Sequence, residues 1–367
     1  MSDVRRRAVG SSGGGRAVLG PLTGYHHEAY AIPLPRGNAL GGRYVRANLR
    51  MPRPGVVWFD RRYFASEDSL LRALHGRIDR IPEVIRTESH GVLQGFVEGR
   101  TLGAGWPGGR SLSARHLSQL GSFFNQLVSV DPYAPDIARL PAVGARPEDG
   151  DSAAVLGQLI DFTEQQVYRR HERRYGPLFA ALGVAGPAGL DRLRERSRTL
   201  TGRPFALLHG DLHRDNFVID LAGDLWVIDW ELAMIGDPLY DLATHLHLMG
   251  HPAHRAARTA GVWRDAVERA RPGSSAGWSR DLPVLLAYKR LQSVYTDVVR
   301  AARSLEDDTA EVNRRRLSAV GWRIQRVLDT AREPLGPGPV PARRQIMAAY
   351  REWLRVTPTR ERGTPPR

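Results

Sequence analysis

The N-terminal part of the chain shows the two-residue alternation of apolar and polar side chains that is typical of half-buried strands. The alternation is plainest at 43–50, where Val, Ala and Leu occupy every second position. Further strands are expected at both ends of 17–36 and within 55–59 and 91–102, and Ser66 provides an N-cap for a helix. A small sheet with a flanking helix is therefore predicted here.

The remainder of the chain follows the helical spacing of apolar residues instead. Helices are expected at 112–130, 153–182, 190–200, 240–249, 263–270, 282–305, 312–331 and 343–356. Segments rich in Pro and Gly interrupt them at 133–150 and 334–339. A sheet-containing part followed by a larger helical part predicts the α+β class, with a boundary near residue 98.

Two apolar runs in the helical part end in polar segments that can carry chemistry. The first leads into His-Gly-Asp-Leu-His-Arg-Asp-Asn at 209–216, and the second ends in Ile-Asp-Trp-Glu at 228–231. Phosphoryl transfer needs a carboxylate that accepts the proton of a hydroxyl, and oxygen ligands that hold Mg²⁺ on the nucleotide phosphates. Asp211 fits the first role, and Asn216 with Asp229 fits the second.

A third element, Gly-Asp-Pro-Leu-Tyr-Asp-Leu-Ala at 236–243, follows these two. Together the three resemble the aminoglycoside phosphotransferase and choline kinase family, small-molecule kinases with a protein-kinase-like fold. Acids that only cap turns are the alternative, but three ordered elements within about forty residues rarely arise by chance. The resemblance implies a two-lobed α+β fold, with a small antiparallel-sheet N-lobe and a larger helical C-lobe. It also implies ATP- and Mg²⁺-dependent phosphorylation of a hydroxyl on a small molecule.

The resemblance also gives roles to residues around these elements. Asp211 would be the catalytic base, and Asp241 would anchor the catalytic loop from the following helix, with an ordinary helix N-cap as the alternative for Asp241. His209 is expected to fix the loop by a hydrogen bond to the backbone rather than to act as a base. His213 is expected to shape the same loop.

Two segments of the N-terminal part are candidates for nucleotide binding. Gly20, Thr23 and Gly24 lie in a turn-rich loop between two expected strands, where backbone N–H groups can face phosphates. A plain hairpin is the alternative for this loop. The resemblance places the adenine edge beside backbone groups near Gln94 and Phe96, in the hinge that ends the N-lobe.

One departure from the family concerns the third strand, where the resemblance implies a lysine that pairs with the nucleotide phosphates and a helix glutamate. Lys289 is the only lysine of this chain. Arg46 is the best positional substitute, with Arg50 on the same strand face and Arg43 on the opposite face as second choices. Glu67 is the expected helix partner. Arginine keeps the positive charge but has a longer, forked head group.

The missing lysine also bears on the function. The stretch 58–62 offers a second placement of the third strand and carries arginines of its own. A nucleotide-binding pseudokinase with a regulatory role is therefore an alternative function. The presence of all three of Asp211, Asn216 and Asp229 argues against it.

The composition adds a strong positive charge. The formal net charge is +14, and all but one of the 53 basic residues are arginine. Abundant Ala, Gly and Pro indicate a coding bias behind the arginine content. The excess charge could attract nucleotides, nucleic acid or anionic lipid. Because no nucleic-acid-binding motif accompanies it, a solvated basic surface is favoured, and a basic nucleic-acid-binding protein is the second alternative function.

The sequence also bounds location and organisation. Without cysteine the chain has no disulfides or thiolate metal sites, and a reducing cytoplasm is the expected location. No apolar run reaches membrane-spanning length. We expect a flexible leader over 1–16, an N-terminal nucleotide-binding lobe over 17–98, a C-terminal catalytic and substrate lobe over 99–335, and a C-terminal helix with a basic tail over 336–367.

The phosphoryl acceptor is left open by the sequence. A kinase that phosphorylates a polycationic aminoglycoside needs clustered acids around the acceptor. The segment 153–200 mixes acids with arginines. It is consistent both with an acidic pocket and with a site for a neutral or anionic hydroxyl compound.

Overall fold

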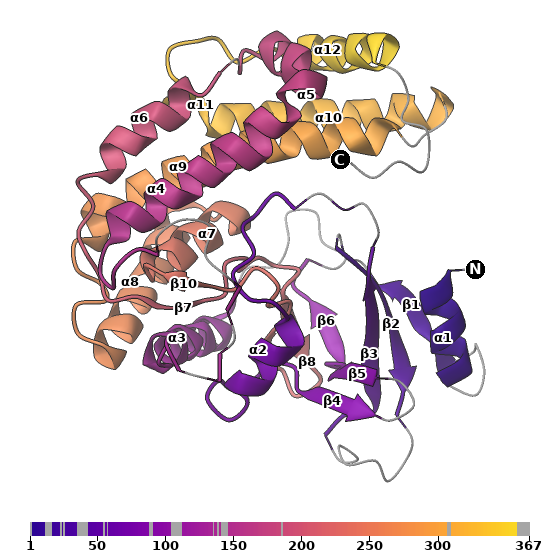
Figure 1. Cartoon of the computed structure of the whole chain (residues 1–367), viewed down its shortest axis with the longest axis vertical. Helices are drawn as coiled ribbons and strands as arrows, with labels where there is room; N and C mark the ends of the chain where they lie inside the picture. The colour runs from indigo at the N-terminus through magenta and orange to yellow at the C-terminus, as the bar shows by residue number, and fades with distance from the viewer. Residues whose placement is uncertain are drawn as a thin grey trace. The chain divides into compact units, whose positions relative to one another are not determined.

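Five antiparallel strands form a sheet in the N-terminal part of the chain, in the order β1-β2-β3-β5-β4, in a computed structural model (Figure 1). The strands are β1 (Leu19–Leu22), β2 (His27–Pro33), β3 (Arg46–Pro52), β4 (Val84–Thr87) and β5 (Gly91–Gly95). Tyr30 of β2 lies opposite Leu49 of β3, and both are buried, so the apolar positions of the alternation share one face. Helix α2 (Glu67–Leu74) begins after Ser66, whose hydroxyl accepts the Ser69 N–H at 3.3 Å.

The structure describes residues 2–11, 17–22, 24, 26–34, 43–53, 56, 58–87, 91–103, 112–134, 136–137, 139–140, 146–184, 186–306 and 310–357. The chain divides into two compact units whose segments interleave in sequence. Unit 1 is made of Met1–Trp58, Arg62–Arg146 and Pro204–Ser275, and unit 2 of Phe59–Arg61, Pro147–Arg203 and Ala276–Arg367. This division differs from the predicted lobes, because the catalytic segment belongs to the same compact unit as the N-terminal sheet.

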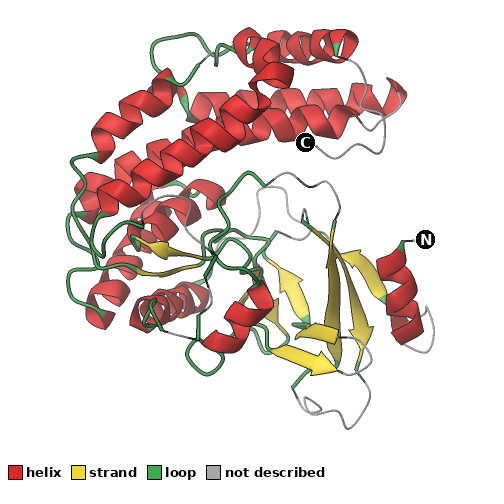
Figure 2. Cartoon of the chain, viewed as in Figure 1, coloured by secondary structure: helices red, strands yellow, loops and turns green. Residues whose placement is uncertain are grey.

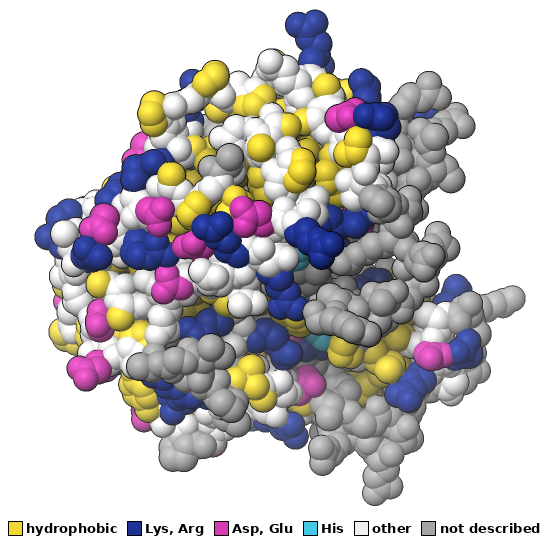
Figure 3. Space-filling view, turned by 45° about the horizontal axis from the view of Figure 1, so that its top comes forward, with side chains coloured by type: hydrophobic (Ala, Val, Ile, Leu, Met, Phe, Trp, Pro, Cys, Tyr) yellow, Lys and Arg dark blue, Asp and Glu magenta, His cyan; other side chains and the backbone are white. Residues whose placement is uncertain are grey.

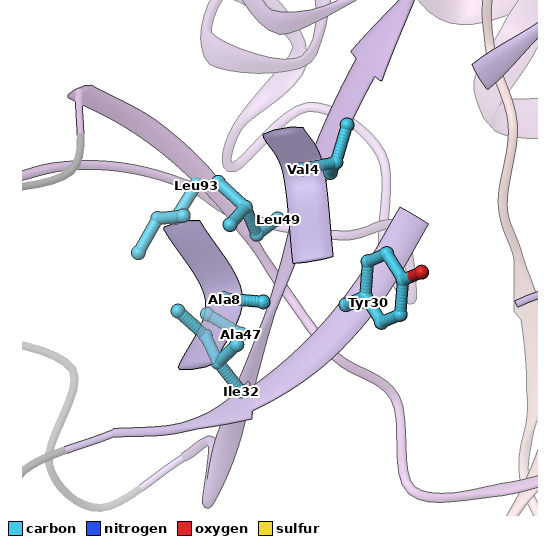
Figure 4. Packing of buried hydrophobic residues seen from close by; sticks show 7 residues of the cluster. All are labelled: Val4, Ala8, Tyr30, Ile32, Ala47, Leu49 and Leu93. Carbon is cyan, nitrogen blue, oxygen red and sulfur yellow. The ribbon is translucent and has the colours of Figure 1, made fainter. Parts of the chain in front are cut away.

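The N-terminal residues form helix α1 (Asp3–Ser11), which lies against β2 and β3. Its Val4 and Ala8 are buried in a cluster with five sheet residues, as Figure 4 shows: Tyr30, Ile32, Ala47, Leu49 and Leu93. The predicted flexible leader is therefore wrong for Asp3–Ser11. Two apolar side chains four positions apart share one helix face, and that face covers apolar surface of the sheet. Residues 12–16 of the predicted leader lie outside the described residues.

Two smaller sheets frame the catalytic segment within unit 1. In one, β7 (Ala206–Leu208) pairs with β10 (Met234–Gly236). In the other, β8 (Phe217–Asp220) pairs with both β6 (Gly99–Thr101) and β9 (Leu225–Val227). The pairing of β6 with β8 brings the residues just after the predicted hinge beside the catalytic segment.

Three further helices belong to unit 1: α3 (Ala114–Ser129), α7 (Leu239–Met249) and α8 (Ala253–Ala270). Helix α3 packs on α8 and on β7, which places it beneath the catalytic segment. Helix α8 is longer than the predicted 263–270. Its first turns are built from Ala, His, Arg and Thr, so the spacing of large apolar side chains did not reveal them.

Within the described residues of unit 2 every regular element is helical (Figure 2). The elements are α4 (Ser152–Phe162), the π-helical η2 (Thr163–Arg169), α5 (Arg170–Ala181), α6 (Ala188–Ser197), α9 (Trp278–Glu306), α10 (Ala310–Thr330), α11 (Arg332–Leu335) and α12 (Arg343–Val356). Tyr168, Phe179 and Tyr295 pack together in their core, with ring centroids 5.4 to 5.9 Å apart. The predicted helix 153–182 is thus three consecutive helical elements.

The predicted α+β class is confirmed, with an antiparallel sheet in the N-terminal part and helices in the C-terminal part. Helix α12 matches the helix predicted at 343–356, while 358–367 of the predicted basic tail lie outside the described residues. None of the described helices combines the length and apolarity that crossing a membrane requires.

Candidate active site

The catalytic loop, residues 209–216, joins β7 to β8 and is fixed from helix α7. The backbone N–H groups of His209 and Gly210 donate to Asp241 Oδ2 and Oδ1, both at 2.8 Å. Asp241 is buried, so these charge-assisted hydrogen bonds do not compete with water. The N-cap position of α7 is Pro238. The geometry therefore matches loop anchoring by Asp241 rather than the alternative of an N-cap.

Gly210 gives this loop a sharp turn directly before Asp211. Its φ is +81°, in the left-handed region that favours glycine. A Cβ at this position would lie 2.3 Å from the carbonyl oxygen of Leu232. Any larger residue would push the loop away from the segment that follows β9, which explains why glycine precedes the candidate base.

His209 is bonded to backbone on both sides of its ring. Nε2 lies 3.1 Å from the Ile228 carbonyl oxygen, and Nδ1 accepts the Asp211 N–H at 3.3 Å. Burial lowers the pKa of His209 to about 4, against the attraction of the Asp211 charge. The ring is therefore neutral near pH 7, and its bonds fit the predicted structural role rather than that of a base.

The carboxylate of Asp211 is held in place and still accessible, with 28% of its side-chain surface exposed. Asn216 Nδ2 donates to Oδ2 at 3.2 Å, and His213 Nε2 lies 3.2 Å from the same oxygen. Burial alone would lower the pKa of His213. The hydrogen bond with Asp211 and the negative charge of Asp211 outweigh burial, so the pKa of His213 is raised. His213 thus bonds the candidate base directly, in addition to shaping the loop. An accessible, oriented carboxylate makes Asp211 a candidate general base.

The two predicted metal ligands, Asn216 and Asp229, are brought together by backbone pairing. The Ile228 N–H donates to the Asn216 carbonyl oxygen at 3.0 Å, directly before Asp229. Asn216 Nδ2 also donates to the backbone carbonyl of Asp211 at 2.9 Å, which orients its side-chain amide. Asp229 has φ +65°, a conformation that non-glycine residues adopt rarely and often at functional sites.

Asp229 lies among other carboxylates. Its Oδ1 is buried and has no hydrogen-bond partner in the part of the chain that the structure describes. Burial of the carboxyl raises the pKa of Asp229 well above its ordinary value, and the charges of Glu67 and Glu231 raise it further, against that of Arg50. A surplus of negative charge beside an unsatisfied oxygen is a setting that a divalent cation relieves.

The structure pairs the helix glutamate with Arg50. Arg50 Nη2 bonds Glu67 Oε2, and both side chains are largely shielded from solvent. The other carboxylate oxygen of Glu67 accepts the Trp230 backbone N–H at 3.0 Å. Glu67, the predicted partner on α2, thus connects β3 with the residue that follows Asp229.

The choice of Arg46 as the partner of Glu67 is wrong. Arg46 Nε donates to Glu98 Oε1 at 2.7 Å, and its guanidinium lies 5.2 Å from the centroid of the Phe96 ring. Four strand positions separate Arg46 from the residue that does pair with Glu67, a distance of about 13 Å along β3. Arg43 forms a separate ion pair before β3 begins.

The predicted phosphate loop is described only in part, because Thr23 lies outside the described residues. Gly20 has φ +135°, and a Cβ there would lie 2.7 Å from the Tyr30 ring. A Cβ at Gly24 would lie 3.3 Å from the His27 carbonyl oxygen. Both glycines therefore permit close packing of the hairpin, and their contact with phosphates stays a prediction.

Gln94 lies within the sheet. Its backbone pairs with β3 and β4, and its side-chain amide donates to Asp68 Oδ1 at 2.8 Å. The Phe96 N–H donates to the Arg46 carbonyl oxygen at 3.0 Å. The sheet already uses these groups, and the adenine contact of Gln94 and Phe96 stays a prediction.

A cluster that the sequence analysis missed joins β2 to the residues after Asp229. His26 Nδ1 bonds Glu231 Oε1, and His27 Nδ1 lies 3.2 Å from Glu231 Oε2. Burial alone would raise the pKa of Glu231, but the bonds and charges of the two histidines outweigh it and lower the pKa to about 2. A His-His pair beside a glycine loop was the available signal. Glu231 lies 205 positions after His26 in the chain, so no local sequence pattern connects the two residues.

The chain matches the sequence model of the phosphotransferase enzyme family over residues 24–280. The matched range includes the catalytic loop, Asp229, Asp241, Arg50 and Glu67. A search of curated protein sequences found no match.

Several solved structures resemble this one at low sequence identity. The macrolide 2'-phosphotransferase MphH from Brachybacterium faecium aligns at 19% identity and a TM-score of 0.48, covering 89% of this chain and 94% of that chain. A thermostable mutant of the aminoglycoside phosphotransferase APH(4)-Ia aligns at 16% identity and a TM-score of 0.49, covering 91% of this chain and 100% of that chain. A choline kinase from Cryptosporidium parvum Iowa II aligns at 12% identity and a TM-score of 0.46, covering 92% of each chain.

Proposed function

The chain belongs to the phosphotransferase enzyme family, and we propose that it transfers the γ-phosphoryl group of ATP to a hydroxyl of a small molecule. One arrangement carries the proposal. The accessible Asp211 is held by Asn216 and His213, and the same Asn216 is bonded to the residue before Asp229. The candidate base and one candidate cation ligand thus lie in one anchored loop, and backbone pairing brings the second candidate ligand, Asp229, close to them.

The proposed reaction uses Asp211 as the base. The acceptor oxygen attacks the γ-phosphorus of ATP while Asp211 accepts the hydroxyl proton. A P–O bond forms to the acceptor, and the bond from the γ-phosphorus to the bridging oxygen breaks, so that ADP leaves. Such reactions need mostly alignment and neutralisation of charge. The two hydrogen bonds from the loop to Asp241 supply the rigidity that alignment requires.

Asn216 and Asp229 fit a magnesium site by their chemistry. Both offer oxygen ligands, and Asp229 Oδ1 has no hydrogen-bond partner among the described residues. No group of three or more His, Asp or Glu side chains in the described ranges is arranged to hold a metal by itself. Mg²⁺ is commonly bound by one or two carboxylates together with substrate phosphates and water, which suits such a pair. When bound, the cation neutralises charge on the phosphates.

Arg50 is the cation that we place against the α- and β-phosphates. Its guanidinium bonds Glu67 through Nη2, and the fork carries further N–H donors. Arginine can bond phosphate through two of these donors, where lysine would provide a point charge. Because Glu67 also bonds Trp230, the guanidinium is held close to Asp229.

The acids of 153–200 are neutralised by neighbouring arginines. Arg194 lies 2.8 Å from Asp161, 3.1 Å from Glu164 and 2.8 Å from Asp191, and the remaining acids of this segment also form ion pairs. Figure 3 shows a similar mixing of basic and acidic side chains over its visible face. We therefore place neutral or anionic hydroxyl compounds ahead of polycations as acceptors.

We expect the purified chain to transfer label from γ-labelled ATP to a member of a panel of sugars, nucleosides, macrolides, amino alcohols and aminoglycosides. Transfer should require Mg²⁺ and stop when EDTA removes it, because the phosphate charge is then unbalanced. Chromatography with mass spectrometry would identify the phosphorylated product. Mg·ATP binding with neither transfer nor ATP hydrolysis across the panel would contradict the proposal and favour the regulatory pseudokinase.

The Asp229→Asn variant should lose the rise in melting temperature that Mg·ATP gives the wild type, because a ligand stabilises the folded chain only when its concentration exceeds its Kd. Asparagine tolerates the left-handed backbone of this position, so the change removes charge and little else. Asp224→Asn is the matched control, since Asp224 lies in the turn between β8 and β9 and pairs with Arg115. Thermal melts with and without Mg·ATP measure the shift, and a full shift in Asp229→Asn would place the cation elsewhere.

A further inference from the structure

His26 and His27 lie where the loop between β1 and β2 ends, and both hold Glu231. His26 Nδ1 bonds one carboxylate oxygen of Glu231, and His27 Nδ1 lies 3.2 Å from the other. Only 8% of the His26 side chain and 10% of the Glu231 side chain are exposed. One hydrogen bond, from His26, and one ion-pair contact, from His27, therefore connect the end of the loop to the segment that contains Asp229, two residues before Glu231.

Aromatic stacking fixes the His26 ring from a second direction. The rings of His26 and Trp58 are stacked, with centroids 4.0 Å apart and planes inclined by 4°. The Arg62 guanidinium lies 4.7 Å from the centroid of the Trp58 ring. The imidazole thus has both its plane and its bonded nitrogen determined by neighbours, which distinguishes it from a mobile surface histidine.

The segment after β9 is held at two consecutive residues. Glu67 accepts the N–H of Trp230 at 3.0 Å, and the two histidines hold Glu231. Asp229 precedes both and has the uncommon φ of +65°. Such a backbone conformation persists when surrounding contacts determine it. The contacts of the two histidines with Glu231 are made two residues after this position.

We propose that His26 and His27 are positioning residues for nucleotide binding, which tie the β1–β2 loop to the Asp229 segment through Glu231. The inference rests on the proposed function, in which the cation at Asp229 meets the phosphates of ATP, and on the predicted contact of the β1–β2 loop with the same phosphates. Two elements that bind one ligand lose less freedom on binding when a bond already fixes their separation. The histidines therefore contribute to ATP affinity without contacting the acceptor.

Calorimetric titration with Mg·ATP tests this in the full chain. His26→Ala should weaken binding about tenfold, the size expected for losing a charge-assisted hydrogen bond. Glu231→Gln should weaken it similarly, and the double variant should bind no more weakly than the weaker single variant, because both changes break the same link. In steady-state assays the KM for ATP should rise, while kcat and the KM for the acceptor change little.

Three further variants separate positioning from general damage. His116→Ala removes another histidine of unit 1, bonded to the Gly223 carbonyl oxygen at 3.2 Å, and should keep wild-type affinity. His26→Asn retains a donor for Glu231 and should recover part of the loss. If His26→Ala does not fold, His27→Ala carries the same test, because 22% of its side chain is exposed.

Two results would overturn the inference, namely wild-type affinity in the folded histidine variant, or additive losses in the double variant. Absence of Mg·ATP binding by the wild type would overturn the proposed function together with it. Wild-type binding with unaffected variants would overturn the positioning role alone, so the two failures are distinguishable.

Discussion

The Asp211→Asn variant should lose at least about a hundredfold in turnover, the range associated with losing a positioned general base. Asparagine has nearly the same shape but cannot accept the proton of the acceptor. Mg·ATP affinity should change little, because Asp211 is not one of the proposed cation ligands. Single-turnover transfer to an acceptor found in the panel would measure the first effect, and calorimetry with Mg·ATP the second.

Asp215→Asn is the matched control for this experiment. Asp215 lies in the same catalytic loop, and 67% of its side chain is exposed. Its replacement should leave turnover close to wild type. Undiminished turnover in Asp211→Asn would remove Asp211 from the role of base. Equal losses in both variants, with lowered melting temperatures, would point to damage of the loop instead.

Arg50→Ala should abolish measurable Mg·ATP binding and lower the free energy of unfolding by about 3 kcal/mol, as expected when one partner of a buried ion pair is removed. Glu67 would then face Asp229 without a compensating charge. Arg50→Lys restores the positive charge and introduces the residue type that the sequence resemblance implies for this strand. It should therefore recover much of the binding.

Arg46→Ala is the control on the same strand. Arg46 pairs with Glu98, and about a quarter of each side chain is exposed. Its loss should cost less than about 1 kcal/mol of unfolding free energy and leave Mg·ATP affinity near wild type. Chemical denaturation and titration of all three variants would measure both quantities. If Arg46→Ala binds Mg·ATP more weakly than Arg50→Ala, the phosphate cation is Arg46 after all.

The catalytic loop could be placed from the sequence because its information is local. The order and spacing of Asp211, Asn216 and Asp229 follow from short strands that enter and leave one loop. Asp241, which accepts the two backbone hydrogen bonds of the loop, lies in the next helix. That helix, α7, begins within the 236–243 motif. Local spacing therefore sufficed to bring these side chains together.

The choice between Arg46 and Arg50 could not be made in the same way. The alternation of β3 puts both on one face, and nothing in the strand says which one lies opposite α2. That depends on the pairing register of β3 and on the course of the chain from β3 to Glu67. Such longer-range information is absent from a two-residue alternation.

Two other features were hidden for related reasons. Helix α1 has only Val4 and Ala8 on its buried face and three consecutive arginines between them, so its composition resembled a polar leader. The link from His26 to Glu231 joins residues far apart in the chain. Each becomes visible only when the partner surface is known.

The interleaving of the two units has a consequence for synthesis on the ribosome. Strand β6 (Gly99–Thr101) pairs with β8 (Phe217–Asp220), and α3 packs on α8, but residues 147–203 of unit 2 are made in between. During synthesis β6 and α3 thus remain without the partners β8 and α8, and α6 remains without α9. Distant pairings close slowly, and uncovered surface invites association with other chains. Neither unit is complete before residue 275 has been made, so a chain that stops earlier lacks part of both.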